Sequence, residues 1–262
     1  MTEDALVEGL RALVDRGEYR DQLDGKPGVE LNGGGAFRHR EGQLYRIYTR
    51  GTPEYDEARA RGWLQGLPPL ARATPAQLAA AEVAVGLPFP RLLRRLYTEV
   101  ADGGFGPGYG LLALAVGGRA DGEAPSVRAQ LGAGLPNDEI GAGFPTREQS
   151  IETTGLGILA NPVRRWAPIG DEPTTLLAVC HWGCGIYSLV DTATDDGRMW
   201  AFDPNPVSDP RDGVFALDHN LAGWLARWID GALLQPCAVQ DEETGRWRGA
   251  TDAEQRAWMA ES

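Results

Sequence analysis

The stretch LLAVCHWGCGIYSLVDTATDDGRMWAF (residues 176–202) contains three short apolar runs separated by turn-forming residues. The segment Trp182-Gly183-Cys184-Gly185 separates the first run from the second, and residues 192–197 separate the second from the third. Strands joined by such short connections pair antiparallel, because parallel neighbours need a long crossover. The sequence therefore predicts an antiparallel meander with strands at residues 176–181, 186–190 and 198–202.

Helices are predicted on both sides of this meander. Thr74 and Gln77 form a capping box around Pro75, and Gly86 ends the helix that they begin. A second helix starts at Pro90, and a late helix follows the meander with Leu221, Trp224, Leu225, Trp228 and Ile229 on one face. Helices followed by a meander and then a helix favour the α+β class, with a mainly antiparallel central sheet flanked by helices. The arginines of the second helix are expected on a solvated face: Arg91, Arg94 and Arg95.

The flanks of this region divide the chain into three parts. Residues 1–66 are predicted as an N-terminal extension with a helix, a Gly-rich loop, a strand at 44–48 and a helix at 54–64. The main domain is expected at residues 70–235. Residues 236–262 form a tail with a short helix, which a capping box at Thr251 and Glu254 begins.

The charge balance disfavours nucleic acid as a partner. The chain has 37 acidic and 25 basic residues, a net charge of -12, and such a surface repels phosphate backbones. No apolar run approaches the ~20 residues of a membrane span. The N-terminal residues lack a secretory signal, and three cysteines make a poor disulfide framework. We therefore expect a cytoplasmic protein with no membrane partner.

Three segments resemble the bacterial SMI1/KNR4 family of the SUKH superfamily. They are ATPAQLAAAEVAVGLPFPRLLRRLYTEVADGGFGPGYGLLAL (residues 73–114), CHWGCGIYS (180–188) and RMWAFD (198–203) with the helix that follows. The resemblance implies a SUKH-like α+β fold and a protein-binding role. Many bacterial members are immunity proteins that block a toxin domain, often a nuclease, and others are regulatory or scaffolding proteins. The family offers no catalytic motif to transfer, and residues 1–66 lie outside the resemblance.

Chemical sites are not predicted by the remaining motifs. Cys180, His181 and Cys184 offer soft ligands, but a structural zinc site needs four ligands, usually in two separated pairs. Neighbouring strand residues also point to opposite faces, which separates Cys180 from His181. The sequence has no nucleophile elbow and no phosphate-binding loop. We therefore expect no metal, no cofactor and no catalytic residue, with a small hydrolase or metal-dependent enzyme as a less favoured alternative.

Acidic and aromatic residues gather in and after the meander. Residues 189–218 contain seven aspartates and two arginines, with Trp200 and two phenylalanines among them. Such a surface suits a basic protein, which charge would steer and buried rings would hold. The alternative is that these aspartates are turn residues and the rings are core. The leading hypothesis is an immunity-type inhibitor that occludes a basic toxin domain, with a cytoplasmic regulatory scaffold as the alternative. The predicted partner-binding residues are Asp195, Asp196, Trp200, Asp203, Asp209 and Asp212.

Overall fold

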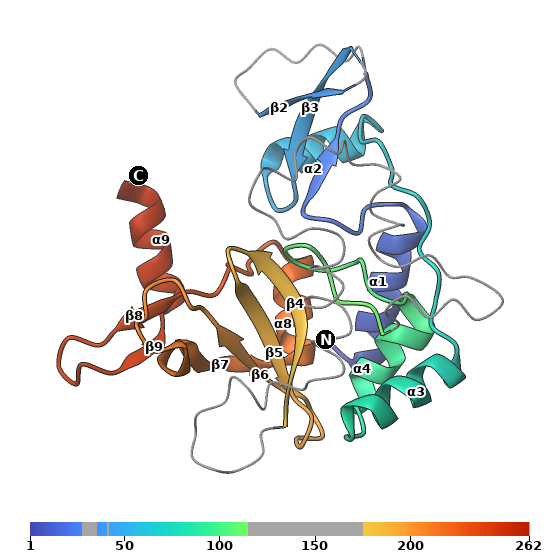
Figure 1. Ribbon diagram of the computed structural model, residues 1–262. Helices are drawn as coiled ribbons and strands as arrows, with labels where there is room; N and C mark the ends of the chain where they lie inside the picture. The colour runs from blue at the N-terminus through green and yellow to red at the C-terminus, as the bar shows by residue number, and fades with distance from the viewer. Residues whose placement is uncertain (28–35, 41, 115–174, 262) are drawn as a thin grey trace.

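The structure is a computed structural model that describes residues 1–27, 36–40, 42–114 and 175–261 (Figure 1). Its helices and antiparallel sheets place it in the α+β class, as predicted. A four-stranded meander contains β4 (Leu176–Gly183), β5 (Ile186–Asp191), β6 (Arg198–Phe202) and β7 (Val214–Asn220), in that order. The three predicted strands are confirmed, and β7 is an addition that the sequence analysis did not identify.

One face of this sheet packs on helices. Leu177, Val179, Val190 and Met199 point into a core shared with α1 (Glu3–Asp15), α4 (Arg91–Arg95) and α8 (Leu221–Ile229). A π-helical turn, η1 (Leu96–Val100), continues α4 into the same core. Figure 1 shows α8 behind the sheet, with α1 and α4 to one side. The helix α1 therefore contributes to the main core, although it lies within the predicted N-terminal extension.

The helix α3 (Pro75–Val85) begins and ends as predicted. The Thr74 hydroxyl accepts the Gln77 N–H, the Gln77 side chain accepts the Thr74 N–H, and Gly86 ends the helix at a φ of 75°. Of the arginines of the next helix, Arg91 and Arg94 are exposed, as predicted, whereas the side chain of Arg95 is only 20% exposed. Arg94 donates to both carboxylate oxygens of Glu82, at 2.7 and 2.8 Å. Arg95 pairs with Glu99 and with Asp4 of α1, so these side chains join neighbouring helices.

A three-stranded sheet precedes these helices. Its strands are β1 (Gln22–Asp24), β2 (Phe37–Arg40) and β3 (Gln43–Thr49), in the order β1-β3-β2. The helix α2 (Pro53–Ala60) covers one face, where Leu23, Tyr48, Tyr55 and Ala58 form a small apolar cluster. The predicted strand at 44–48 is confirmed, and the predicted helix at 54–64 ends earlier, because the left-handed Gly62 follows it.

Arg50 connects this N-terminal sheet to the main core. Its guanidinium lies 5.4 Å from the ring centre of Tyr55 and 4.9 Å from that of Trp228 in α8. It also donates a hydrogen bond to the backbone carbonyl of Glu18. An arginine between two rings makes cation–π contacts with both, so Arg50 links the N-terminal sheet and α2 to the main core.

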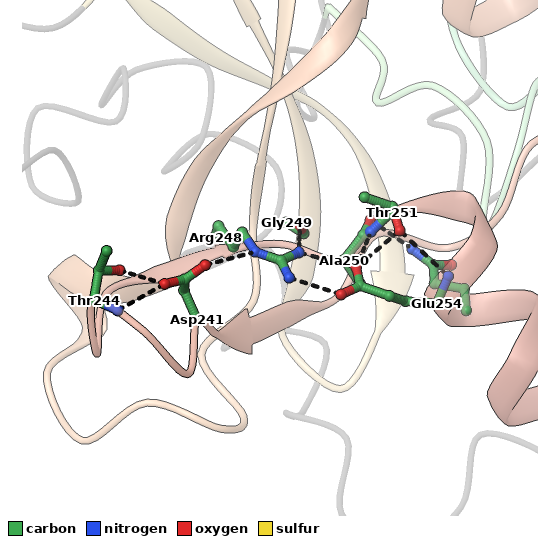
Figure 2. Close-up of polar contacts among 8 residues, drawn as sticks. Asp241, Thr244, Arg248, Gly249, Ala250, Thr251 and Glu254 are labelled. Carbon is green, nitrogen blue, oxygen red and sulfur yellow. Dashed lines mark hydrogen bonds and ion pairs between the residues drawn. The ribbon is translucent and has the colours of Figure 1, made fainter.

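The C-terminal tail packs along β7. It consists of a hairpin, β8 (Ala238–Gln240) with β9 (Trp247–Gly249), followed by α9 (Asp252–Glu261). Figure 2 shows Arg248 bridging the hairpin turn and the start of α9: it donates to Glu254 at 2.7 Å and lies 3.7 Å from Asp241. Thr251 and Glu254 form the predicted capping box. The hairpin itself was not predicted.

Candidate functional site

The predicted acidic residues do not form one patch. Asp195 and Asp196 lie exposed in the turn before β6, whereas Asp203, Asp209 and Asp212 follow its other end. The strand has five residues and, at ~3.3 Å per residue, it separates the two groups by roughly 17 Å. The sheet therefore divides the predicted surface into two parts with different surroundings.

Asp203 and Trp200 serve the interior of the protein. The side chain of Asp203 is only 4% exposed and accepts three hydrogen bonds. Its donors are the backbone and side-chain amides of Asn205, at 3.0 and 2.8 Å, and the backbone N–H of Ala238, at 2.9 Å. Trp200 packs on the second face of the sheet against an apolar cluster that includes Leu189 and Phe202. The structure thus gives both residues a packing role where we had predicted contact with a partner.

Asp209 and Asp212 lie beside basic side chains. Asp209 caps the short helix η4 (Pro210–Gly213) and accepts hydrogen bonds from the N–H and the Nε of Arg211, at 2.9 and 2.7 Å. These bonds lower the pKa of the Asp209 carboxyl. Asp212 is exposed and lines an open cleft of about 490 Å³, which Arg211 and Arg246 also line. The charge at this end of the sheet is therefore mixed.

The opposite end of the sheet is acidic. Asp195 and Asp196 are exposed, and Asp196 accepts a hydrogen bond from the side-chain amide of Asn220 at 3.2 Å. Asn220 pairs with Arg198 across the β6–β7 ladder, which brings the end of β7 next to this turn. Asp218, two residues earlier on β7, has a side chain that is 82% exposed. Asp195, Asp196 and Asp218 are called the acidic end below.

Basic groups compensate this acidic end only in part. Among the described residues, no arginine or lysine forms an ion pair with Asp195 or Asp196. Asp218 lies 2.7 Å from Nδ1 of His219 and 4.0 Å from the guanidinium of Arg227, and these contacts lower the pKa of the Asp218 carboxyl. Burial lowers the pKa of His219, so its ring is neutral at pH 7 and offers no full positive charge. The acidic end consequently presents negative charge to solvent.

A second surface feature forms where the Gly-rich segment after η1 meets the β4–β5 hairpin. The Tyr109 N–H donates to the His181 carbonyl at 2.9 Å, and the Leu112 N–H donates to the Val179 carbonyl at 2.8 Å. Two of the three segments that carry the family resemblance therefore touch in space. Gly108 makes this approach possible: its φ is 57°, and a Cβ there would lie 2.8 Å from the His181 carbonyl oxygen.

Three aromatic rings are in contact at this junction. The ring of Tyr109 meets that of His181 edge-on at 5.4 Å between centroids, and His181 stacks on Tyr187 at 4.6 Å. Tyr109 is 53% exposed, whereas Tyr187 is buried. Burial lowers the pKa of His181, which leaves the imidazole uncharged at neutral pH. Tyr109, His181 and Tyr187 are called the aromatic tip below.

The thiols beside this tip have separate surroundings. Cys180 is fully buried, its Sγ lies 3.1 Å from the Pro107 carbonyl oxygen, and burial raises its pKa well above that of a free thiol. Cys184 is exposed at the turn of the β4–β5 hairpin. In the part of the chain that the structure describes, no three His, Cys, Asp or Glu side chains gather as metal ligands would.

No family model, curated protein or solved structure matches the chain. Within the described ranges, no helix combines the length and the apolar character that crossing a membrane requires. The function must therefore be argued from the two surface features, the acidic end and the aromatic tip.

Part of the acidic end could be predicted from the sequence, whereas the aromatic tip could not. Asp195 and Asp196 were predicted, and Asp218 was counted among the aspartates of that region. Tyr109 and His181 lie far apart in the sequence, and only tertiary packing joins them. One signal was available: Tyr109 lies between Gly108 and Gly110, in a glycine-rich segment typical of turns and of close backbone approach.

Proposed function

We propose that the chain is a non-catalytic protein-binding module with a SUKH-like fold, which acts in the cytoplasm as an immunity-type inhibitor of a basic toxin domain. The observation that carries the proposal is the acidic end, where Asp195 and Asp196 are exposed and form no ion pair with a basic side chain of the described residues. The helices, Gly-rich segment, meander and late helix follow one another in the order that the family resemblance implies. In this proposal, α1 and the N-terminal sheet are additions to that fold.

The acidic end would act mainly on the rate of association. Exposed carboxylates on a chain of net charge -12 attract a basic partner over distance, and electrostatic steering raises association rate constants well above those of neutral pairs. The inhibitor would then cover the active site of the toxin domain by occlusion. No reaction by this chain is needed for that role.

The first test measures protection and binding together. A toxin domain encoded beside the gene of this chain would be expressed in bacteria with and without the chain, and binding of the purified pair would be followed at low and high salt. We expect restored growth and an association rate that falls as salt increases. Absence of both protection and binding would contradict the inhibitor role and leave the scaffold alternative.

A matched pair of triple variants tests the acidic end itself. Asp195→Asn, Asp196→Asn and Asp218→Asn together should lower the association rate constant at low salt about tenfold and reduce its salt dependence. The control, Asp15→Asn, Asp56→Asn and Glu242→Gln, removes the same charge from exposed acidic residues on α1, α2 and the C-terminal hairpin. An equal decrease in both triple variants would assign the effect to net charge and reject the acidic end as the contact site.

A further inference from the structure

The aromatic tip presents one ring to solvent on a rigid support. Tyr109 is 53% exposed, and its ring rests edge-on against His181, which stacks on the buried Tyr187. Most large apolar side chains of the described residues are covered, so an exposed ring with two rings behind it is unusual on this surface. Tyrosine is among the residues that most often dominate binding energy in protein interfaces.

Backbone contacts fix the position of Tyr109. Its N–H donates to the His181 carbonyl at 2.9 Å, and the preceding N–H, of Gly108, donates to the carboxylate of Asp21 at 2.8 Å. Asp21 also accepts the indole N–H of Trp228, which anchors the segment to α8. With its backbone held in this way and its ring against that of His181, Tyr109 has less conformational freedom to lose when a partner binds, which favours its use as an anchor.

The electrostatics of the aromatic tip favour a cation. The face of a tyrosine ring is its negative region, and a guanidinium or ammonium within about 6 Å of the ring centre is attracted to it. The neutral His181 adds no opposing charge. The carboxylate of Asp21 accepts the N–H of Gly108, the residue before Tyr109, at 2.8 Å. The net charge of -12 on the chain also favours the approach of a cationic group.

From these contacts we infer that Tyr109, supported by His181 and Tyr187, is an anchor that receives an arginine or lysine side chain of the protein partner. The inference rests on the proposed function, because it names a specific contact for the basic partner. The partner's cation would lie over the exposed face of the Tyr109 ring, with no covalent step. The acidic end would steer the partner, and the aromatic tip would hold it.

The first experiment probes the anchor without the partner. A short acetylated peptide with two arginines would be titrated into the whole chain at millimolar concentration, and ring signals of Tyr109 and His181 would be followed by NMR. The same peptide with citrulline has nearly the same shape without the charge. We expect the arginine peptide to shift these ring signals at concentrations two- to fivefold lower than the citrulline peptide needs. Equal titration by the two peptides would overturn the inference.

The second experiment uses the toxin domain and three variants. Tyr109→Leu should shorten the lifetime of the complex about tenfold, because most effects of interface substitutions are on dissociation. Tyr109→Phe keeps the ring and should stay within twofold of the wild type. Phe37→Leu, at another exposed ring on β2, should change nothing.

The outcomes separate the two claims. A stable complex whose lifetime is the same with Tyr109→Leu would overturn the anchor and leave the proposed function intact. Arginine-selective shifts at Tyr109 in a chain that binds no toxin domain would support the anchor and count against the proposed function. If Tyr109→Leu fails to fold, the peptide titration with the wild type and with Tyr109→Phe still decides the matter, because neither removes the ring.

Discussion

The carboxylate of Asp203 accepts a hydrogen bond from the backbone N–H of Ala238 at 2.9 Å, so the end of β6 holds the start of the C-terminal hairpin. The same carboxylate binds both amide groups of Asn205. Because it is buried, loss of the carboxylate would leave the buried N–H of Ala238 without a partner, and Asn205 would lose both of its hydrogen bonds.

We therefore expect Asp203→Ala to lower the free energy of unfolding by about 2–4 kcal/mol, through several hydrogen bonds to one charged group. Asp212→Ala removes a carboxylate at an exposed position and should change the free energy of unfolding by less than about 0.5 kcal/mol. Urea unfolding of both variants checks the prediction. Similar midpoints for the two would show that Asp203 is not a structural carboxylate.

Asp203 and Asp212 also show which features of the structure could be predicted from local sequence and which could not. Asp203 and Asp212 both stand in turn-like surroundings with aromatic residues nearby, and local sequence gives them the same interpretation. The C-terminal hairpin packs along β7 and its first residue, Ala238, bonds to Asp203, which is buried, while Asp212 stays exposed. Burial by a distant segment carries no local signal, so the buried position of Asp203 could not be predicted from its neighbours in the sequence.

Local signals were sufficient elsewhere. The meander and the capping boxes at Thr74 and Thr251 depend on turn residues and side-chain caps, which act within a few residues. The strand β7 was missed because its sequence, VFALDHN, is polar at the end that enters α8. The hairpin β8–β9 was missed because each strand has three residues, too few to show an alternation.

Cys184 occupies a turn position that favours another residue. Cys184 and Gly185 are the two turn residues between β4 and β5, with φ angles of 50° and 78°. Two-residue hairpin turns with both φ angles positive favour Asn followed by Gly. We expect Cys184→Asn to raise the free energy of unfolding by about 0.5–1 kcal/mol, because asparagine tolerates this conformation better. Cys184→Ala keeps the steric penalty and should unfold as the wild type does; equal gains from both would contradict this explanation.

Gly108 should be far more sensitive to substitution than Gly42. Both have a positive φ, but a Cβ at Gly108 would lie 2.8 Å from the His181 carbonyl oxygen, whereas a Cβ at Gly42 meets nothing within 4 Å. Gly42→Ala should cost about 1 kcal/mol from backbone conformation alone. Gly108→Ala adds a backbone clash and should cost about 2–4 kcal/mol in total. Thermal unfolding of the two variants compares them directly, and equal losses would refute the close approach.

Glu254 predicts a pH dependence of stability. Hydrogen bonds from Arg248 and Thr251 lower the pKa of the Glu254 carboxyl to about 2, from an ordinary value near 4.5 (Figure 2). A carboxylate whose pKa is depressed on folding stabilises the protein above the unfolded-state pKa, and that contribution disappears as pH falls through the folded-state pKa. Glu254→Gln should therefore be less stable than the wild type at pH 6.

The difference in the free energy of unfolding between the wild type and Glu254→Gln should shrink progressively between pH 4.5 and pH 2, because the wild-type carboxyl becomes protonated, and therefore neutral, over this range. Urea midpoints at pH 6, 4 and 3 would measure it. Glu243→Gln, at an exposed position in the turn between β8 and β9, should match the wild type at each pH. If the difference in stability between the wild type and Glu254→Gln stays constant from pH 6 to pH 3, the negative charge of Glu254 does not stabilise the folded protein. The bridge from Arg248 to α9 would then contribute through geometry alone.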